Sequence, residues 1–374
     1  MKTFLLNFYQ AGRVREVIRA HGIEPKRGVC YLETMFIEKK DLKTPSFSEL
    51  RKWFNELEFP TYRSKQLIHW IYNKKIEHPG LLTDFSKKER LFLEENSYIS
   101  ALETVRKIDS RDGTVKFQFQ LEDAQQIETV LIPDKERKTL CVSTQVGCGI
   151  DCQFCLTAKG GLKRNLKAHE IVDQYLILSK QYEITNIVMM GMGEPLANFQ
   201  EVSEAIDRLT DANACNFSPR RITVSTAGLV PGIQKLGEHP QKVNLAVSLN
   251  ATTNETRDMI MPINQTYPIE MLLDACRKFP LSPRRRIFFE YVLLKGVNDS
   301  LNDARRIPKL LKGIPSKVNL IPFNPFFGSP FERPDESTIH AFQKLLIDSH
   351  LTTFIRKTRG NDVLAACGLL ARSG

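Results

Sequence analysis

The sequence predicts an α/β fold: a partial barrel of six βα units, preceded by a helical region and a strand pair. Two observations carry this prediction. From Thr139 to Arg359, short apolar runs alternate with amphipathic stretches, which is the pattern of βα units around a parallel sheet. Residues 46–98 show helical periodicity instead. Six units are fewer than the eight of a closed barrel, so we expect an open one.

The barrel strands are expected where short apolar runs are rich in β-branched residues, at 139–144, 184–191, 221–228, 242–249, 286–294 and 317–323. Helices are expected between them at 167–181, 199–210, 268–279 and 300–312. The loops after the carboxyl ends of parallel strands form one face of such a barrel. Functional residues are therefore expected at strand ends.

The chain divides into four predicted parts: an N-terminal extension at 1–45, a helical accessory domain at 46–98, a β-hairpin linker at 99–137 and the barrel at 138–374. Ser46 and Glu49 have the spacing of a capping box. Basic residues surround the apolar face of the helical domain, namely Lys52, Arg63, Lys65, Lys74 and Lys75. They indicate either a phosphate-binding surface or the solvated face of a small structural domain.

Composition limits the classes of protein to consider. Hydrophobic residues make up 42% and charged residues 26%, as in ordinary soluble domains. No apolar run is long enough to span a membrane, so we expect no membrane partner. We expect a cytoplasmic protein, because its cysteines suit a reducing compartment. The net charge of +10 favours a polyanionic partner such as nucleic acid. Eight cysteines, three of them clustered, indicate a reducing compartment rather than a disulfide scaffold.

Cys148, Cys152 and Cys155 have the spacing CxxxCxxC directly after the first predicted strand. Three thiolates at this spacing can bind three irons of a [4Fe–4S] cluster, which leaves the fourth iron open to a small molecule. Zinc is the alternative, because Cys141 lies close enough in sequence to be a fourth ligand. Spacing alone leaves both readings open.

Small and polar residues follow the later predicted strands. Gly193 and Glu194 end the second strand, and glycine lets the backbone approach a ligand closely. Such an element alone is a weak signal, because it could simply be a tight turn. Polar residues at the ends of the following strands could likewise each simply terminate a strand.

With Phe154 before the third cysteine, the cluster motif resembles that of the radical S-adenosylmethionine (SAM) superfamily. The segments 62–72, 139–148 and 355–370 resemble, more narrowly, the adenine-C2 methyltransferases of 23S rRNA and tRNA. The resemblance implies a radical SAM (βα)6 barrel with a [4Fe–4S] cluster on Cys148, Cys152 and Cys155. It also implies that SAM binds the open iron and contacts Gly193, Glu194, Ser225, Ser248, Leu249, Asn250 and Asn324.

The same resemblance implies a mechanism. Cys367 takes a methyl group from one SAM, and a radical derived from a second SAM removes a hydrogen from that methyl group. The resulting radical adds to C2 of the adenine beside the tRNA anticodon or in 23S rRNA. Glu128 accepts the C2 proton, and Cys141 attacks the Cys367 sulfur to release the product and form a disulfide. An electron donor such as flavodoxin and a monomeric enzyme are expected.

Two rival functions remain. An adenine-C8 rRNA methyltransferase of the antibiotic-resistance type uses the same pair of cysteines. A non-catalytic RNA-binding protein could instead be stapled by zinc on Cys141, Cys148, Cys152 and Cys155. The chain also departs from the family pattern, because Asn250 stands where many members have histidine and residues 1–45 match none of the motifs. Cys30, Cys215 and Cys276 match no family position and are expected to be inert.

Overall fold

The computed structural model describes residues 39–370, which form two compact units. One unit contains residues 39–101 together with Arg208–Phe217, and the other contains Leu102–Asp207 and residues 218–370. Most of the predicted N-terminal extension, and Cys30 with it, lies outside the described residues. Within residues 39–370, no helix is both long enough and apolar enough to cross a membrane.

The larger unit is built on a ten-stranded sheet with the order β14-β13-β12-β11-β10-β9-β6-β5-β4-β3. All neighbours from β14 to β6 pair in parallel. These strands are β6 (Arg137–Cys141), β9 (Asn186–Met189), β10 (Ile222–Thr226), β11 (Asn244–Ser248), β12 (Ile287–Leu293), β13 (Ser316–Pro322) and β14 (Thr353–Ile355). The six predicted strands are all present. The seventh, β14, has only three residues and showed no strand pattern in the sequence.

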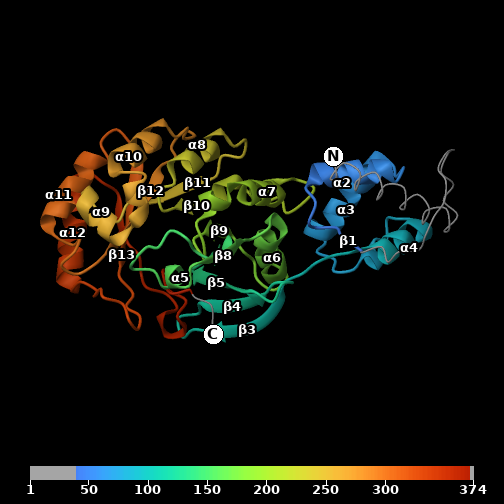
Figure 1. The fold of residues 1–374 in the computed structure, drawn as a ribbon, viewed down its shortest axis with the longest axis horizontal. Coiled ribbons are helices and arrows are strands. Elements are labelled where there is room, and N and C mark those ends of the chain that lie inside the picture. Colours follow the sequence, from blue (N-terminus) through green and yellow to red (C-terminus); the bar gives the residue numbers. More distant parts are fainter. Residues whose placement is uncertain (1–38, 371–374) are drawn as a thin grey trace. The chain divides into compact units, whose positions relative to one another are not determined.

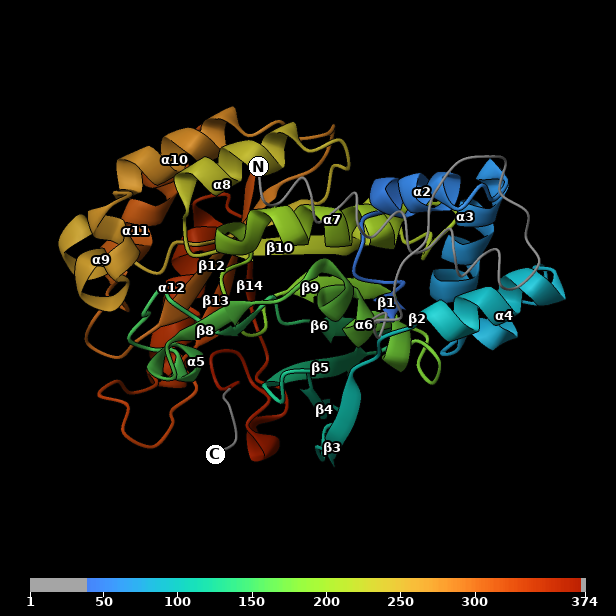
Figure 2. The same ribbon diagram turned by 45° about the vertical axis from the view of Figure 1, so that its right-hand side comes forward.

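Helices follow the parallel strands and cover the outer side of the curved sheet, as Figures 1 and 2 show for α8, α10, α11 and α12. The helices of the barrel are α6 (Ala168–Leu178), α7 (Phe199–Thr210), α8 (Val230–Glu238), α9 (Asn254–Ile260), α10 (Ile269–Lys278), α11 (Leu301–Leu310) and α12 (Glu336–Asp348). Strand residues such as Ile187, Phe289 and Leu320 are completely buried and form the core beneath them. The predicted α/β partial barrel is confirmed.

The segment predicted as a hairpin linker continues the barrel sheet instead. Strands β3 (Glu103–Asp109), β4 (Val115–Gln120) and β5 (Gln126–Asp134) pair antiparallel, and β5 pairs with β6. Phe119 and Ile127 are completely buried, so these three strands enclose buried apolar side chains as part of the larger unit. The physical reason is that β6 would otherwise leave an open sheet edge, and β5 covers it.

The smaller unit contains α2 (Phe47–Glu56), α3 (Thr61–Ile68), a π-helical turn (His69–Asn73), a 3-10 turn (Pro79–Leu81) and α4 (Lys87–Asn96). Strands β1 (Lys40–Asp41) and β2 (Ser97–Tyr98) pair in parallel, so residues predicted as part of the extension belong to this unit. The capping box is present: Ser46 Oγ accepts from the Glu49 amide, and the Glu49 carboxylate accepts from the Ser46 amide.

Two arginines of the smaller unit have structural roles. Arg208 is 1% exposed and donates to the carbonyls of Lys43 and Pro45, which explains why 208–217 belongs to this unit. Arg63 donates to both carboxylate oxygens of Glu89, at 3.1 and 2.8 Å. The expectation that Arg63 contributes to a free basic surface is therefore wrong, because its guanidinium is already bound within the fold.

The cysteine motif lies in a hairpin of its own. Strand β7 (Gln145–Gly147) pairs antiparallel with β8 (Leu162–Asn165), and the loop between them carries the three cysteines and the short helix α5 (Leu156–Lys159). Gly147 has φ +78°, and a Cβ there would lie 1.8 Å from the Gly161 carbonyl oxygen. Only glycine permits this close approach, through which the Cys148 amide donates to that carbonyl at 3.1 Å.

Candidate active site

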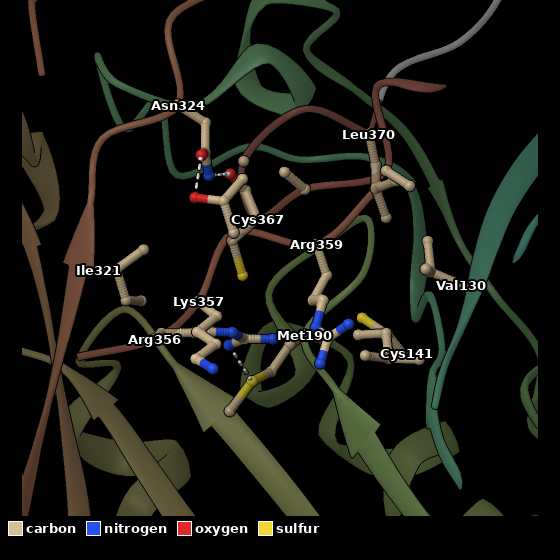
Figure 3. A pocket seen from close by; sticks show the side chains of 15 residues that line it. Val130, Cys141, Met190, Ile321, Asn324, Arg356, Lys357, Arg359, Cys367 and Leu370 are labelled. Carbon is tan, nitrogen blue, oxygen red and sulfur yellow. Dashed lines mark hydrogen bonds between the residues drawn. The ribbon is translucent and has the colours of Figure 1, made fainter. Parts of the chain in front are cut away.

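A pocket lies at the carboxyl ends of the barrel strands and brings Cys141 together with Cys367. Cys141 ends β6, Met190 follows β9 and Arg356 follows β14. Figure 3 shows the side chains of Cys141 and Cys367 reaching into the same pocket, together with Arg356. The pocket is lined by Val130, Ile132, Cys141, Met190, Ile321, Asn324, Arg356, Lys357, Thr358, Arg359, Ala365, Ala366, Cys367, Gly368 and Leu370.

The charge of Arg356 acts on both cysteines. Burial raises the pKa of the Cys141 thiol to about 12, with a smaller contribution from Cys367, while Arg356 opposes the rise. The pKa of Arg356 is raised chiefly by Cys367, with Glu290 and Cys141 contributing less. The positive charge of Arg356 therefore favours the thiolate form of Cys141. Arg356 lies in the C-terminal motif, yet its sequence position gave no sign of this role.

The segment that carries Cys367 is tied to the turn between β3 and β4. The Gly360 amide donates to Asp112 Oδ2 at 3.0 Å, and Asp362 accepts from Ser110 Oγ at 2.6 Å. Closer to the cysteine, Asn324 Nδ2 donates to the Cys367 carbonyl at 3.3 Å. Asn324 therefore positions Cys367 in this structure. A SAM contact was predicted for Asn324 from the sequence.

The cysteine loop packs directly against the segment that carries Cys367. The Leu156 amide donates to the Gly368 carbonyl at 2.7 Å, and Thr157 Oγ1 donates to the Leu370 carbonyl. Burial raises the pKa of the Cys155 thiol, and Cys367 is among the further contributors. Both observations place Cys367 beside the predicted cluster ligands.

The three loop cysteines fit an iron–sulfur cluster better than zinc. Burial raises the pKa of the Cys148 thiol to about 12 and that of the Cys152 thiol well above its usual value, and Cys155 adds to both rises, so the thiols lie close together. Across residues 39–370, no three His, Cys, Asp or Glu side chains converge as a single metal ion requires. A cube instead takes each thiolate on a different iron. Cys141, the fourth ligand of the zinc reading, lines the Cys367 pocket instead.

Gly193 and Glu194 lie beside the cysteine loop. Gly193 has φ +104°, and a Cβ there would lie 2.6 Å from Gln145 Cβ and 2.8 Å from the Gln145 amide nitrogen. Glu194 accepts hydrogen bonds from the amides of Ala227 (2.7 Å) and Leu196 (3.1 Å). Burial raises the pKa of Glu194 to about 7 despite these bonds. A carboxylate has about four acceptor positions, so Glu194 can still accept from a ligand ammonium group.

The remaining predicted SAM contacts differ in their surroundings. Ser225 and Ser248 are half-buried on the same face of the sheet, because Ser225 pairs with Ala246, two residues before Ser248. Leu249 is 1% exposed, with its amide bonded to the Glu290 carbonyl and its own carbonyl to Arg257. Arg257 also bonds the carbonyls of Ser248 and Ala227, and it thereby holds these strand ends in place. Nothing in the sequence indicates this role of Arg257.

The side chain of Asn250 is used within the protein. Its Oδ1 accepts from the Val292 amide at 2.8 Å, and its Nδ2 donates to Met261 Sδ at 3.2 Å. Asn250 has φ +55° and is 1% exposed, so it stabilises a left-handed turn after β11. The SAM contact expected at this residue stays a prediction.

Glu128 lies on the pocket side of β5. Side chains alternate along a strand, so Glu128 shares a face with Val130 and Ile132, which line the pocket. Its carboxylate is 2.9 Å from Lys116 Nζ, and both side chains are buried. Lys116 also donates to the Leu364 carbonyl at 3.4 Å, in the segment that carries Cys367. Lys116 was missed because the sequence predicts the strand pair but not the register that brings Lys116 to Glu128.

Known proteins resemble the chain over nearly its whole length. The radical SAM superfamily model matches residues 142–306, and the N-terminal domain model of ribosomal RNA large subunit methyltransferases matches residues 40–99. The dual-specificity RNA methyltransferase RlmN of Pelobacter propionicus is 50% identical over 333 residues, which are 89% of this chain and 96% of that protein. The chain belongs to the RlmN family.

Two further comparisons support the same family. RlmN of Desulfosudis oleivorans is 50% identical over 98% of this chain and 96% of its own length, so its match extends into residues 1–45, where motifs showed no counterpart. The crystal structure of a radical SAM methyltransferase from Sphaerobacter thermophilus has a TM-score of 0.83 and 40% identity, covering 88% of this chain and 99% of that one. The predicted radical SAM fold and methyltransferase class are confirmed, and the family implies a [4Fe–4S] cluster and SAM.

Proposed function

We propose that this enzyme methylates C2 of an adenine in 23S rRNA, and of the adenine beside the anticodon in tRNA, in the cytoplasm. One observation carries the proposal: Cys141 and Cys367 line one pocket, directly beside the loop with the CxxxCxxC cysteines. The names of the RlmN relatives supply the substrate class, since they are dual-specificity RNA methyltransferases.

Cys148, Cys152 and Cys155 would hold the cluster, and Gly193, Glu194, Ser225 and Ser248 would surround SAM. When bound, the cluster and two SAM molecules per turnover supply the methyl group and the radical chemistry that activates it, with electrons from a donor such as flavodoxin. The protein residues supply orientation and proton transfer. Arg356 would supply a positive charge beside Cys367 in the pocket.

Glu128 would take the C2 proton of the adenine once the adenine is bonded to the Cys367-linked carbon. The adduct must also lose one electron to become closed-shell, and the oxidised cluster on Cys148, Cys152 and Cys155 would supply the acceptor. Glu128 is suited to taking the proton because it lies on the pocket face of β5 and is held by Lys116. The lysine, 2.9 Å away, helps to hold the carboxylate in place.

Cys141 would then release the product. Its thiolate attacks the Cys367 sulfur, so that a sulfur–sulfur bond forms and the carbon–sulfur bond breaks. The electron pair of the broken bond goes to the carbon, which takes up a proton and remains on adenine as the methyl group. The disulfide must be reduced by two electrons from an external dithiol before the next turnover.

RNA would be gripped in part by exposed lysines of the smaller unit. Lys52, Lys65 and Lys74 are exposed there, whereas Arg63 is bound to Glu89. Lysines supply affinity for phosphates without reading the base sequence. They therefore suit an enzyme that accepts two different RNAs.

The position of the methyl group on the product adenosine distinguishes the C2 reaction from the C8 reaction. The protein is purified anaerobically, reduced in the presence of SAM and incubated with unmodified tRNA and an unmodified 23S rRNA fragment. Mass spectrometry of the digested RNA should show 2-methyladenosine. 8-Methyladenosine would establish the C8 reaction instead. Stoichiometric zinc in place of iron and sulfide, with no methylated product, would establish the zinc-stapled RNA-binding protein.

A further inference from the structure

The loop after β13 exposes one aromatic side chain completely. Phe327 has a relative exposure of 105%, whereas Phe323 is 2% exposed. The neighbouring rings anchor this loop: Phe323 contacts Phe326 and Phe331, with centroids 6.2 and 6.3 Å apart. Phe327 is therefore held outward by a loop whose other aromatic residues pack inward.

Phe327 is close to the pocket that holds Cys367. Asn324, three residues earlier, lines that pocket and donates to the Cys367 carbonyl at 3.3 Å. Three residues span at most about 11 Å, so Phe327 lies within about that distance of Asn324. A base next to a pocket-bound adenine lies closer than this, because stacked bases are ~3.4 Å apart. Phe326 packs on the same apolar cluster as Cys152 and Phe154. The loop that exposes Phe327 thus contacts both parts of the candidate active site.

Cations lie in the same pocket. Lys357 is exposed, and the Arg359 side chain is 33% exposed and 3.9 Å from Asp134. An exposed aromatic ring near cationic side chains is the combination that binds single-stranded nucleic acid, because bases stack on the ring and phosphates pair with the cations.

We infer that Phe327 stacks on an RNA base next to the adenine that enters the pocket. The adenine must leave its stack to reach Cys367, so a neighbouring base loses a stacking partner. The Phe327 ring replaces that partner and keeps the RNA open at the pocket. This inference rests on the proposed function only in taking RNA as the substrate.

Four variants test it. Phe327→Ala and Phe327→Leu remove the ring, and Phe327→Trp keeps a larger one. Phe354→Ala is the matched control, because Phe354 is 49% exposed on the edge strand β14 and does not line the pocket. The dissociation constants of unmodified tRNA and of an unmodified 23S rRNA fragment are measured at several salt concentrations, with thermal unfolding checked for every variant.

Loss of one stacked base should weaken RNA binding by about 5- to 150-fold in both Phe327→Ala and Phe327→Leu. The salt dependence should stay the same, because no phosphate contact is lost. Phe327→Trp should bind like the parent, with its fluorescence quenched by RNA, and Phe354→Ala should also bind like the parent. Affinity of Phe327→Ala within two-fold of the parent would overturn the inference. A parent protein that binds neither RNA would instead overturn the proposed function.

Discussion

The backbone amide of Leu156 donates a hydrogen bond to the Gly368 carbonyl at 2.7 Å. Leu156 follows the third cysteine of the CxxxCxxC motif, and Gly368 follows Cys367. The two segments that the proposed chemistry must bring together are therefore held by a hydrogen bond between backbone atoms. Their spacing does not depend on the conformation of a flexible side chain.

Replacement of Gly193 should abolish SAM binding. In Gly193→Ala, the new Cβ would meet Gln145 Cβ at 2.6 Å and force apart the loops that carry Glu194 and Cys148. The control is Gly296→Ala, since Gly296 also has a positive φ but no atom lies within 4 Å of its Cβ position. Both variants carry backbone strain of about 1 kcal/mol. Calorimetry with SAM should show no binding for Gly193→Ala and normal binding for Gly296→Ala; equal binding would contradict the site.

Removal of the Lys116 charge should slow methylation. In Lys116→Met, Glu128 loses the cation 2.9 Å away that helps to hold its carboxylate on the pocket face of β5. Loss of one partner of a buried ion pair also lowers stability, by about 3–5 kcal/mol, so thermal unfolding must accompany the assay. Lys116→Arg should restore much of the rate. A folded Lys116→Met that methylates RNA at the parent rate would show that methylation does not depend on this ion pair.

The sequence predicted those parts of the molecule that depend on local pattern. The six longer parallel strands are continuous apolar runs, and the Ser46 capping box depends on two residues three apart. The parts that were missed depend on contacts between distant segments. Arg257, Arg356 and Lys116 act on loops or strands whose neighbours only the folded sheet defines.

Asn250 and Arg63 show what a sequence leaves undetermined. Both are polar residues in promising positions, and their side chains are nevertheless bound within the protein. A sequence shows which polar groups are present but not which of them the fold has already used. For the same reason, the cysteine pair was predicted only through resemblance to a family, because no spacing rule relates Cys141 to Cys367.

Neutralising three exposed lysines of the smaller unit should weaken RNA binding. The triple replacement of Lys52, Lys65 and Lys74 by Gln should lower the slope of log affinity against log salt concentration by about 2–3, since each phosphate contact contributes ~0.7–0.9. Replacement of Lys278, Lys309 and Lys312, which are exposed on the barrel, is the control at equal net charge. Equal slopes for the two triple variants would show that the smaller unit does not grip phosphate.

Product release should accelerate as the pH rises. The pKa of Cys141 is raised to about 12 by burial, so only a small fraction is thiolate at neutral pH, and that fraction increases with pH. Single-turnover release of RNA from the Cys367-linked state should therefore speed up about ten-fold per pH unit from pH 7 to 9. A rate that levels off below pH 8 would mean that another group limits release.

The variant Cys141→Ala provides the most direct test of the roles assigned to the two cysteines. After reaction with SAM, reductant and unmodified RNA, denaturing electrophoresis and peptide mass spectrometry should show RNA covalently attached through Cys367. Cys367→Ala should form no adduct and no product, and Cys215→Ala, which removes a half-buried cysteine outside the pocket, should turn over like the parent. Normal turnover by folded Cys141→Ala, or an adduct attached at any residue other than Cys367, would contradict the proposed mechanism.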